Sequence, residues 1–443
     1  MKKKSPAFYR YCQEMATGHL SYYETEEIEA AVFDLLDLSM VDDAEYLAEA
    51  GLNMHPNDED TEKLLIWIYL HNHKADKAEQ MYAKYRDDGS AWSSRMEFSM
   101  SVMHGHPQQA LERYVVELAN GHTPARDWID AIDEMFDALP SAVLAPYLEK
   151  AAKYIGQDAE TMGRLGSMLF DVHSYEAAAR TLESALDLDA YDIYSWQDLA
   201  RCYMMQQDFE KCMEACDYGL AVDENNALLG FIKGYILYQY AEYAACIPFL
   251  NIARRFAEGR IDMHNVNATE DEIQQQIDIT YELLGFAYLE TNKNEQAHEC
   301  FTILTERNPR NIVARLQLAT IALLEGDLNT ANDHANEALA IDPKYDAARS
   351  LQISILMSMH DFEGAYKSLK LLLHRKPRNQ EYLFAFAQLC VHMHRDKEAE
   401  TSFRKLLKMH VKNKEFRKMI RDYFIGIGDY EAAEEAGGES IEK

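Results

Sequence analysis

Three pairs of histidines, each pair separated by one residue, are the first candidates for chemistry in this chain. They are His71 and His73, His104 and His106, and His392 and His394. A His-x-His pair can bind a metal, but a zinc site needs three or four ligands held together. No adequate ligand set accompanies these pairs. We therefore expect no metal site, and we expect each pair to lie in a turn, where histidine tolerates unusual backbone angles.

Two cysteines, Cys212 and Cys216, are spaced so that both thiols can share one face of a helix. A redox or metal-binding pair is one interpretation. We favour the alternative, that both are small buried side chains, because free cysteine is commonly buried. Seven cysteines in 443 residues form no disulfide framework, which is typical of a reducing, cytoplasmic setting.

Patterns typical of enzymes are missing from the sequence. It has no G-x-x-x-x-G-K-[ST] phosphate loop and no G-x-S-x-G nucleophile motif. Its many carboxylates are explained by solvated acidic helix faces, without a constrained acid–base pair. We expect no enzymatic activity and no cofactor.

The composition is that of a globular, helical chain. Apolar residues make up 48%, and only 10 prolines and 19 glycines interrupt the sequence, which favours long helices. No apolar run is long enough to cross a bilayer, so we expect no membrane span. The start, MKKKSPAFYRYCQEM, is basic but has no apolar segment behind it, which argues against a secretory signal peptide.

Charge is distributed unevenly along the chain, whose net charge is -31. Residues 1–226 contain 18 Lys and Arg against 43 Asp and Glu, whereas residues 344–421 contain 17 against 8. The acidic total argues against broad nucleic-acid binding through phosphate neutralisation. The acidic front and the basic back could attract each other in neighbouring molecules, which makes a homo-oligomer one alternative.

The elements that must position any site repeat with a fixed period. A small residue recurs at Ala178, Cys212, Cys246, Ala297, Ala331, Ala365, Ala399 and Ala433. The numbering advances by 34 at every step except the one from Cys246 to Ala297, which is longer by half a period. The excess is an insertion near 261–277. Thr269 and Glu272 form a capping-box pattern there, which predicts that the insertion extends the following helix.

This period, which we call the repeat length, predicts a two-helix repeat. Two further positions fit it. Gly105, Gly326 and Gly428 fall at the expected turn between the two helices. A second set of small residues recurs within the first helix, where it would let the second helix approach closely: Gly166, Ala200, Gly234, Gly285 and Ala319.

These positions resemble the tetratricopeptide repeat (TPR) family. The pattern is matched by Trp196, Leu199, Tyr203, Phe209 and Leu220, by Leu284, Gly285, Tyr288, Ala297, Phe301 and Pro309, and by Leu318, Ala319, Ala331, Ala338 and Pro343. The resemblance covers nearly the whole chain, as in a soluble bacterial-type protein of about twelve repeats. It implies an all-α fold, an α-solenoid forming a right-handed superhelix whose first helices line a concave groove.

The expected organisation follows the period. It comprises an N-terminal capping segment (1–24), divergent acidic repeats (25–158), regular repeats (159–260), the insertion (261–277), further repeats (278–413), and a C-terminal partial repeat with a polar tail (414–443).

The resemblance also implies which residues face a partner. In the family, certain positions of the first helix line the groove. The equivalent positions in the central repeats of this chain are Tyr194, Gln197, Arg201, Phe231, Tyr235, Tyr238, Glu282 and Phe286. In the acidic front they are Glu26, Glu29, Asp37, Asp127, Asp130, Glu134 and Asp137. Phe231, Tyr235 and Tyr238 share one helix face, which suits recognition of a peptide. The alternative is that these rings pack between the helices of adjacent repeats.

The sequence departs from one known subgroup of the family. TPR co-chaperones bind a C-terminal carboxylate with a Lys/Asn clamp, and Lys63 stands at one clamp position, but Trp67 replaces the asparagine one turn later. We therefore predict a non-enzymatic scaffold that binds a protein or peptide partner in the groove.

Two alternatives use the charged ends. One is self-assembly through the opposite charges, and the other is a regulatory module that binds nucleic acid through its C-terminal basic face. That face consists of Lys367, Lys370, Arg375, Lys376, Arg378, Arg404, Lys405, Lys408, Lys412 and Lys414.

Overall fold

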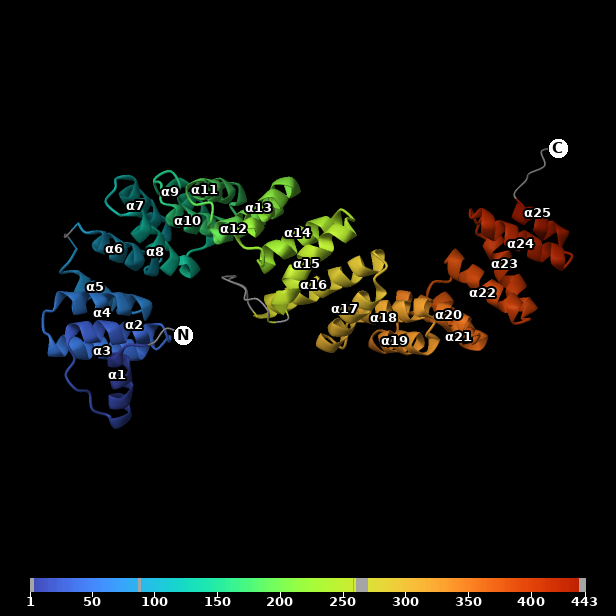
Figure 1. The fold of residues 1–443 in the computed structure, drawn as a ribbon, viewed down its shortest axis with the longest axis horizontal. Coiled ribbons are helices and arrows are strands. Elements are labelled where there is room, and N and C mark those ends of the chain that lie inside the picture. The colour runs from blue at the N-terminus through green and yellow to red at the C-terminus, as the bar shows by residue number, and fades with distance from the viewer. Residues whose placement is uncertain (1–3, 87–88, 258, 260–269, 438–443) are drawn as a thin grey trace. The chain divides into compact units, whose positions relative to one another are not determined.

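The computed structural model describes residues 4–86, 89–257, 259 and 270–437 of the chain. Within these residues it contains 25 α-helices, one short 3-10 helix and no β-strand (Figure 1). The prediction of an all-α solenoid built from helix-turn-helix repeats is confirmed. None of the helices in the described part has both the length and the apolar character that a bilayer span requires. The chain divides into two compact units, Met1–Ile232 and Lys233–Lys443.

The first unit begins with α1 (Pro6–Thr17), which precedes a series of antiparallel helix pairs. The first helices of these pairs are α2 (Thr25–Leu36), α4 (Glu59–His71), α6 (Ala91–Met103), α8 (Ala125–Glu134), α10 (Ala159–Asp171) and α12 (Ile193–Met205). The second helices are α3 (Val41–Met54), α5 (Ala75–Tyr82), α7 (Pro107–Ala119), α9 (Ser141–Ala151), α11 (Tyr175–Leu188) and α13 (Phe209–Val222). A 3-10 turn, η1 (Phe136–Ala138), follows α8, and the division between the units falls within α14 (Ala227–Gln239).

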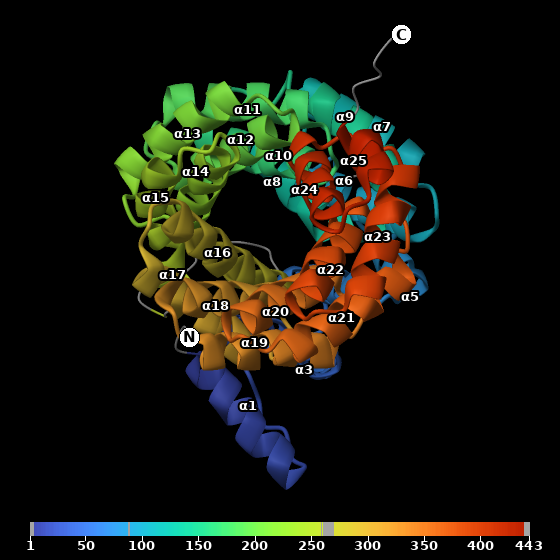
Figure 2. The same ribbon diagram turned by 90° about the vertical axis from the view of Figure 1, so that its right-hand side faces the viewer.

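The second unit continues the same alternation. Its first helices are α16 (Glu270–Glu290), α18 (Ile312–Glu325), α20 (Asp346–Ser358), α22 (Gln380–His392) and α24 (Lys414–Gly426). Its second helices are α15 (Tyr243–Ala257), α17 (Asn294–Arg307), α19 (Leu328–Ile341), α21 (Phe362–Arg375), α23 (Asp396–Lys408) and α25 (Tyr430–Gly437). Within each unit taken by itself, the first helices from α6 onward lie on the inner side of the curve and their second helices on the outer side (Figure 2). We call the inner side the first-helix face.

The helices begin at side-chain caps that recur with the period. Asp158 accepts a hydrogen bond from the Thr161 backbone N–H at the start of α10, and Asp192 caps α12 one repeat length later. Asn379 and Asn413 cap α22 and α24 in the same way, again one repeat length apart. Each such cap contributes on the order of 1 kcal/mol to helix stability. The caps therefore fix where each first helix starts, and so which of its residues reach the first-helix face.

In every pair except α8–α9, the turn between the two helices contains one residue in the left-handed backbone region. These residues are Ser39 and His73, then His173, Gln207 and Ala241, then Asn292, Gly326, His360, His394 and Gly428, and neighbours inside each group are one repeat length apart. Gly105 takes the same role between His104 and His106. The prediction that the histidine pairs lie in turns is confirmed for His104 and His106, whereas His71 and His392 are the last residues of α4 and α22 and only His73 and His394 lie in the turn. Among the described residues, no group of three His, Cys, Asp or Glu side chains is placed to hold a metal ion.

Close packing within a pair depends on the small residue of the first helix. A Cβ atom on Gly166 would lie 2.5 Å from Cδ2 of Leu182 on the second helix, and a Cβ on Gly234 would lie 2.6 Å from Cγ of Leu250. The spacing from glycine to leucine is the same in both repeats, so the contact recurs with the sequence period. The predicted role of these small residues is confirmed.

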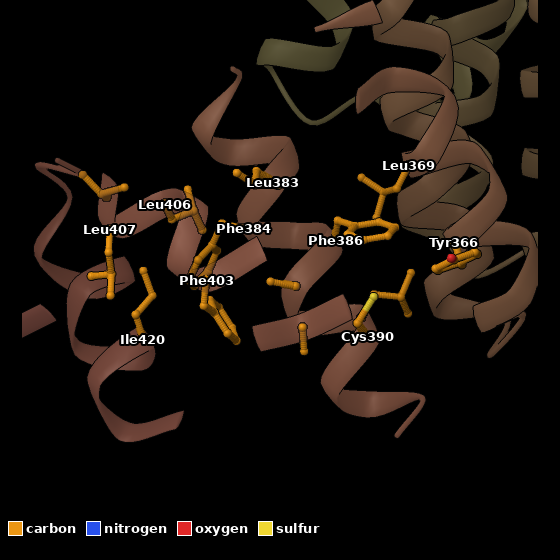
Figure 3. Packing of buried hydrophobic residues seen from close by; sticks show 14 of the residues in the cluster. Tyr366, Leu369, Leu383, Phe384, Phe386, Cys390, Phe403, Leu406, Leu407 and Ile420 are labelled. Atoms are coloured by element: carbon orange, nitrogen blue, oxygen red, sulfur yellow. The ribbon is translucent and has the colours of Figure 1, made fainter. Parts of the chain in front are cut away.

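Apolar side chains between successive pairs form the core. At the C-terminal end, Phe384 stacks on Phe416 at 3.8 Å between ring centroids and lies 6.2 Å from Phe403, and Figure 3 shows the buried side chains of this cluster from close by. The predicted burial of Cys212 and Cys216 is also confirmed. Burial raises the pKa of the neighbouring thiol of Cys202 to about 12, so this thiol stays protonated.

One helix departs from the common length. The helix α16 has 21 residues, whereas the first helices on either side of it, α14 and α18, have 13 and 14. It begins at Glu270, inside the interval 261–277 where the sequence contains its insertion. The capping box predicted from Thr269 and Glu272 lies outside the described residues, since Thr269 is not among them.

Candidate partner-binding site

A cavity of about 580 Å³ lies on the first-helix face of the first unit, and we call it the N-terminal groove. All of its lining residues belong to first helices: α2, α4, α6 and α8. Its apolar wall contains the rings of Phe33, Trp67 and Trp92. A volume of this size is in the range of sites that enclose several side chains of a ligand.

The aromatic rings of the groove are held by neighbours on consecutive helices. Phe33 and Trp67 lie 6.1 Å apart, and Trp67 lies 4.1 Å from the His71 ring. Trp92 lies 5.5 Å from Tyr85 in an edge-to-face arrangement. Phe33 is 46% exposed, which is unusual for a phenylalanine in a packed repeat. The groove thus presents an accessible ring on a wall whose other rings are fixed by packing.

The cations of the groove are paired within the chain. Lys63 Nζ lies 2.6 Å from the Glu59 carboxylate and 5.2 Å from the centre of the Trp92 ring. Arg95 forms an ion pair with Glu134 across the floor of the groove, from α6 to α8. Both basic side chains therefore already have an acidic partner within the chain.

The remaining charges of the groove are acidic. Glu29 on α2 and Asp60 in the first turn of α4 both line the groove and are exposed. Within the part of the chain that the structure describes, neither carboxylate takes part in an ion pair. Since Lys63 and Arg95 are compensated, the groove as a whole attracts a positive charge.

Further along the same face, acids and arginines alternate between α8, α10 and α12. Arg164 lies 2.6 Å from Asp130 and 3.3 Å from Asp133. Arg201 lies 2.8 Å from Asp198, and its guanidinium lies 4.0 Å from the centre of the Phe170 ring. Arg164 joins α10 to α8, and the Arg201 guanidinium joins α12 to α10, so these contacts link successive first helices.

The predicted central residues of the first unit differ in accessibility. Tyr194 is 43% exposed at the start of α12, and Arg201 is half-buried. Phe231, on α14, is also half-buried. Gln197 is only 5% exposed, and its Nε2 donates a hydrogen bond to Oδ1 of Asn226, which caps α14. The Gln197 amide is therefore engaged by the neighbouring repeat.

The predicted central residues of the second unit lie on α14 and α16, and all are half-buried. Tyr238 contacts Tyr243 at 5.4 Å, and Phe286 contacts Phe301 at 5.4 Å, both edge to face. Burial raises the pKa of Tyr238, with smaller contributions from nearby groups that include Glu282. Tyr235, on the same helix, is followed in the sequence by the buried side chain of Ile236. These rings combine partial packing with partial exposure.

Burial also raises the pKa of the Glu282 carboxyl, and the charge of Asp278 one turn earlier adds to this effect. Asp278 itself is paired with Arg307 at 2.6 Å. A carboxylate that is partly desolvated beside a second acid is well placed to accept a proton or a positively charged group.

The C-terminal basic face is partly compensated inside the second unit. Arg375 and Lys376 both pair with Asp346, and Arg404 pairs with Glu400 and Asp429. These pairs reduce the positive charge that the face can offer to an acidic partner.

A family model for the tetratricopeptide repeat matches residues 283–346, from the second half of α16 to just beyond α19. The periodic spacing of caps, turns and close helix contacts continues on both sides of this segment. This chain contains tetratricopeptide repeats.

Two curated relatives are similar to part of the chain. Anaphase-promoting complex subunit 3 of Schizosaccharomyces pombe is 24% identical over 188 residues, which are 42% of this chain and 26% of that protein. The TPR repeat-containing protein MJ1428 of Methanocaldococcus jannaschii is 20% identical over 214 residues, 48% of this chain and 34% of that protein. The chain thus spans only 26% and 34% of the length of these relatives.

Solved structures show similar arrays. YrrB, a TPR protein with an unusual peptide-binding site, has a TM-score of 0.37 at 17% identity, with 45% of this chain and 95% of that chain covered. A tetratricopeptide repeat protein from Parabacteroides merdae has a TM-score of 0.36 at 13% identity, with 60% and 98% covered. Tetratricopeptide repeats in general serve as scaffolds for protein–protein interaction.

Sequence reasoning missed the aromatic side of the N-terminal groove in this tetratricopeptide-repeat protein. It assigned Glu29 and Glu134 to the first-helix face, and both line the groove. It treated Trp67 only as a departure from the carboxylate clamp. The missed signal was spacing, because Phe33 and Trp67 are one repeat length apart and so occupy the same position in consecutive repeats.

Proposed function

We propose that this tetratricopeptide-repeat protein binds a peptide segment of a protein partner along its first-helix face. The N-terminal groove is the observation that carries the proposal. It is an open cavity of about 580 Å³, formed wholly by first helices, with an exposed ring at Phe33 and fixed rings at Trp67 and Trp92. Aromatic side chains at the centre of a surface, with charged residues around them, are typical of sites that dominate protein–protein affinity.

The central residues provide one further contact region in each unit under the same proposal. In the first unit this region consists of Tyr194, Arg201 and Phe231, and in the second unit of Tyr235, Tyr238, Glu282 and Phe286. Support comes from their partial exposure, which leaves part of each ring accessible while its neighbours hold it in place. Gln197 contributes by holding the cap of α14 rather than by touching the peptide.

The test is affinity capture by the full chain, followed by mass spectrometry, with three variants. Trp67→Ala opens the N-terminal groove, and the double variant Phe231→Ala with Tyr235→Ala removes rings from the central region. Tyr191→Ala is the control, because Tyr191 is 82% exposed between α11 and α12. We expect both groove variants to lose partners that the control retains, with circular dichroism unchanged. Retention of the same proteins by both groove variants would contradict the proposal.

A further inference from the structure

We infer that the N-terminal groove selects peptides in which a lysine or arginine stands next to a large apolar side chain. This inference rests on the proposed function, since it specifies the partner of that groove. The two basic side chains of the groove, Lys63 and Arg95, already have partners within the chain. Lys63 is held by Glu59 and by the Trp92 ring, and Arg95 is held by Glu134. A ligand carboxylate would have to displace these partners, so the groove is poorly suited to acidic peptides.

The two carboxylates that remain determine the charge of the ligand. Glu29 and Asp60 come from neighbouring first helices, line the same cavity and are exposed. They also lie in the part of the sequence where residues 1–226 contain 43 acidic against 18 basic residues. Clefts lined by one sign of charge attract ligands of the opposite sign. A basic side chain entering the groove therefore gains both the local carboxylates and the wider field.

The apolar wall determines the rest of the motif. The exposed ring of Phe33 lies against Trp67, and an apolar ligand side chain placed there would be removed from water by both rings. The same rings can also contact the cation, because a guanidinium or ammonium is attracted to an aromatic face. The cavity is large enough for two adjacent ligand side chains, one apolar and one basic.

Two other kinds of peptide fit the groove less well. A carboxylate-ended peptide requires free cations, which the pairs of Lys63 and Arg95 deny it. A purely apolar segment leaves Glu29 and Asp60 without a function in binding, and their removal would then have no effect.

The test is a selection of peptides from a random displayed library by the purified full chain. It compares the native protein with Glu29→Gln/Asp60→Asn. The control is Glu112→Gln/Asp76→Asn, which changes the net charge equally at exposed positions on second helices, outside the groove lining. All four side chains lie at least partly in solvent, so we expect the fold to be retained. The highest-ranked peptide is then synthesised, and its binding is measured by fluorescence anisotropy.

We expect the native protein and the control to enrich Lys or Arg beside an apolar residue. The groove variant should lose the basic preference and bind the synthetic peptide about tenfold more weakly. Enrichment of acidic or uncharged peptides, or an unchanged basic preference in the groove variant, would overturn the inference while leaving the proposed function intact. If the folded native protein enriches no peptide at all, both the inference and the proposed function fail.

Discussion

The rings of Phe33 and Trp67 lie 6.1 Å apart on consecutive first helices, and the two residues are separated by one repeat length. Phe33 is 46% exposed, so its contact with Trp67 contributes little to the core. We predict that Phe33→Ala weakens partner binding while lowering the free energy of unfolding by only about 1 kcal/mol. Phe384→Ala, which removes a 5% exposed ring stacked on Phe416, should cost about 3–5 kcal/mol. Denaturant titration and partner capture measure the two effects, and equal destabilisation by both variants would contradict this distinction.

A second prediction concerns the contact between Gly285 and Phe301. A Cβ on Gly285 would lie 2.6 Å from Cζ of the Phe301 ring, which is fully buried. Gly285→Ala should therefore destabilise α16 and α17 by about 1–3 kcal/mol, despite the higher helix propensity of alanine. Gly426→Ala is the matched control, since a Cβ there meets nothing within 4 Å. Thermal unfolding should show a lower midpoint for the first variant, and an unchanged or slightly raised midpoint for the control.

The Gly285 contact shows what could be predicted from the sequence. The repeat period assigns every position to a helix, a turn or a close contact, and Gly285, Ala297 and Phe301 followed from it because each repeat packs in the same way. The same logic placed His104 and His106 in a turn without any view of the backbone. Features that repeat are predictable because one favourable packing solution is reused along the chain.

The particular chemistry of the first-helix face was less predictable. The repeats that contain Arg95 and Glu134 are divergent, and the two residues are separated by more than one repeat length. The period therefore does not predict the ion pair between them. Gln197 has the register of a groove residue, yet it bonds Asn226 because the neighbouring cap comes within 3.1 Å of its amide. Such pairings decide whether a polar side chain is available to a ligand or is bonded to a neighbouring repeat. The position of a residue within its repeat does not predict them.

A third prediction uses the left-handed turn residues. Ala241 has φ = 58°, a region in which its Cβ approaches the following carbonyl, whereas Gly326 occupies the equivalent turn of another repeat without that cost. We predict that Ala241→Gly stabilises the α14–α15 pair by up to about 1 kcal/mol and that Gly326→Ala destabilises its own pair by a similar amount. Amide hydrogen exchange of the helices on each side measures both local changes. Faster exchange around Ala241 after the first substitution would contradict the explanation.

A fourth prediction concerns the pH dependence of Glu282. Burial, with the charge of Asp278, raises the pKa of this carboxyl in the folded protein. The folded state therefore binds the proton more tightly than the unfolded state, and ionisation of Glu282 opposes folding at neutral pH. Glu282→Gln should raise the thermal midpoint at neutral pH, and its advantage should shrink as the pH falls through the raised pKa. The exposed Glu299→Gln serves as control, and an equal effect of both substitutions would argue against burial as the cause.

The opposite pH dependence of stability is expected for Glu45, which is 6% exposed on α3. Burial alone would raise the pKa of its carboxyl, but hydrogen bonds from Lys74 and Asn72 and the charge of Lys77 outweigh burial and lower it. A lowered folded pKa means that the charged form stabilises the fold above the unfolded pKa, and that this contribution is lost as the pH falls through the folded pKa.

Glu45→Gln should therefore cost about 2 kcal/mol at neutral pH, because Lys74 loses the carboxylate that lies 2.6 Å away. In acid the native carboxyl is protonated as well, so the difference between the two proteins should vanish. Unfolding in denaturant across an acid-to-neutral pH series measures this convergence. A constant difference at every pH would mean that packing of α3 against α4 and α5, rather than the charge of Glu45, accounts for the loss.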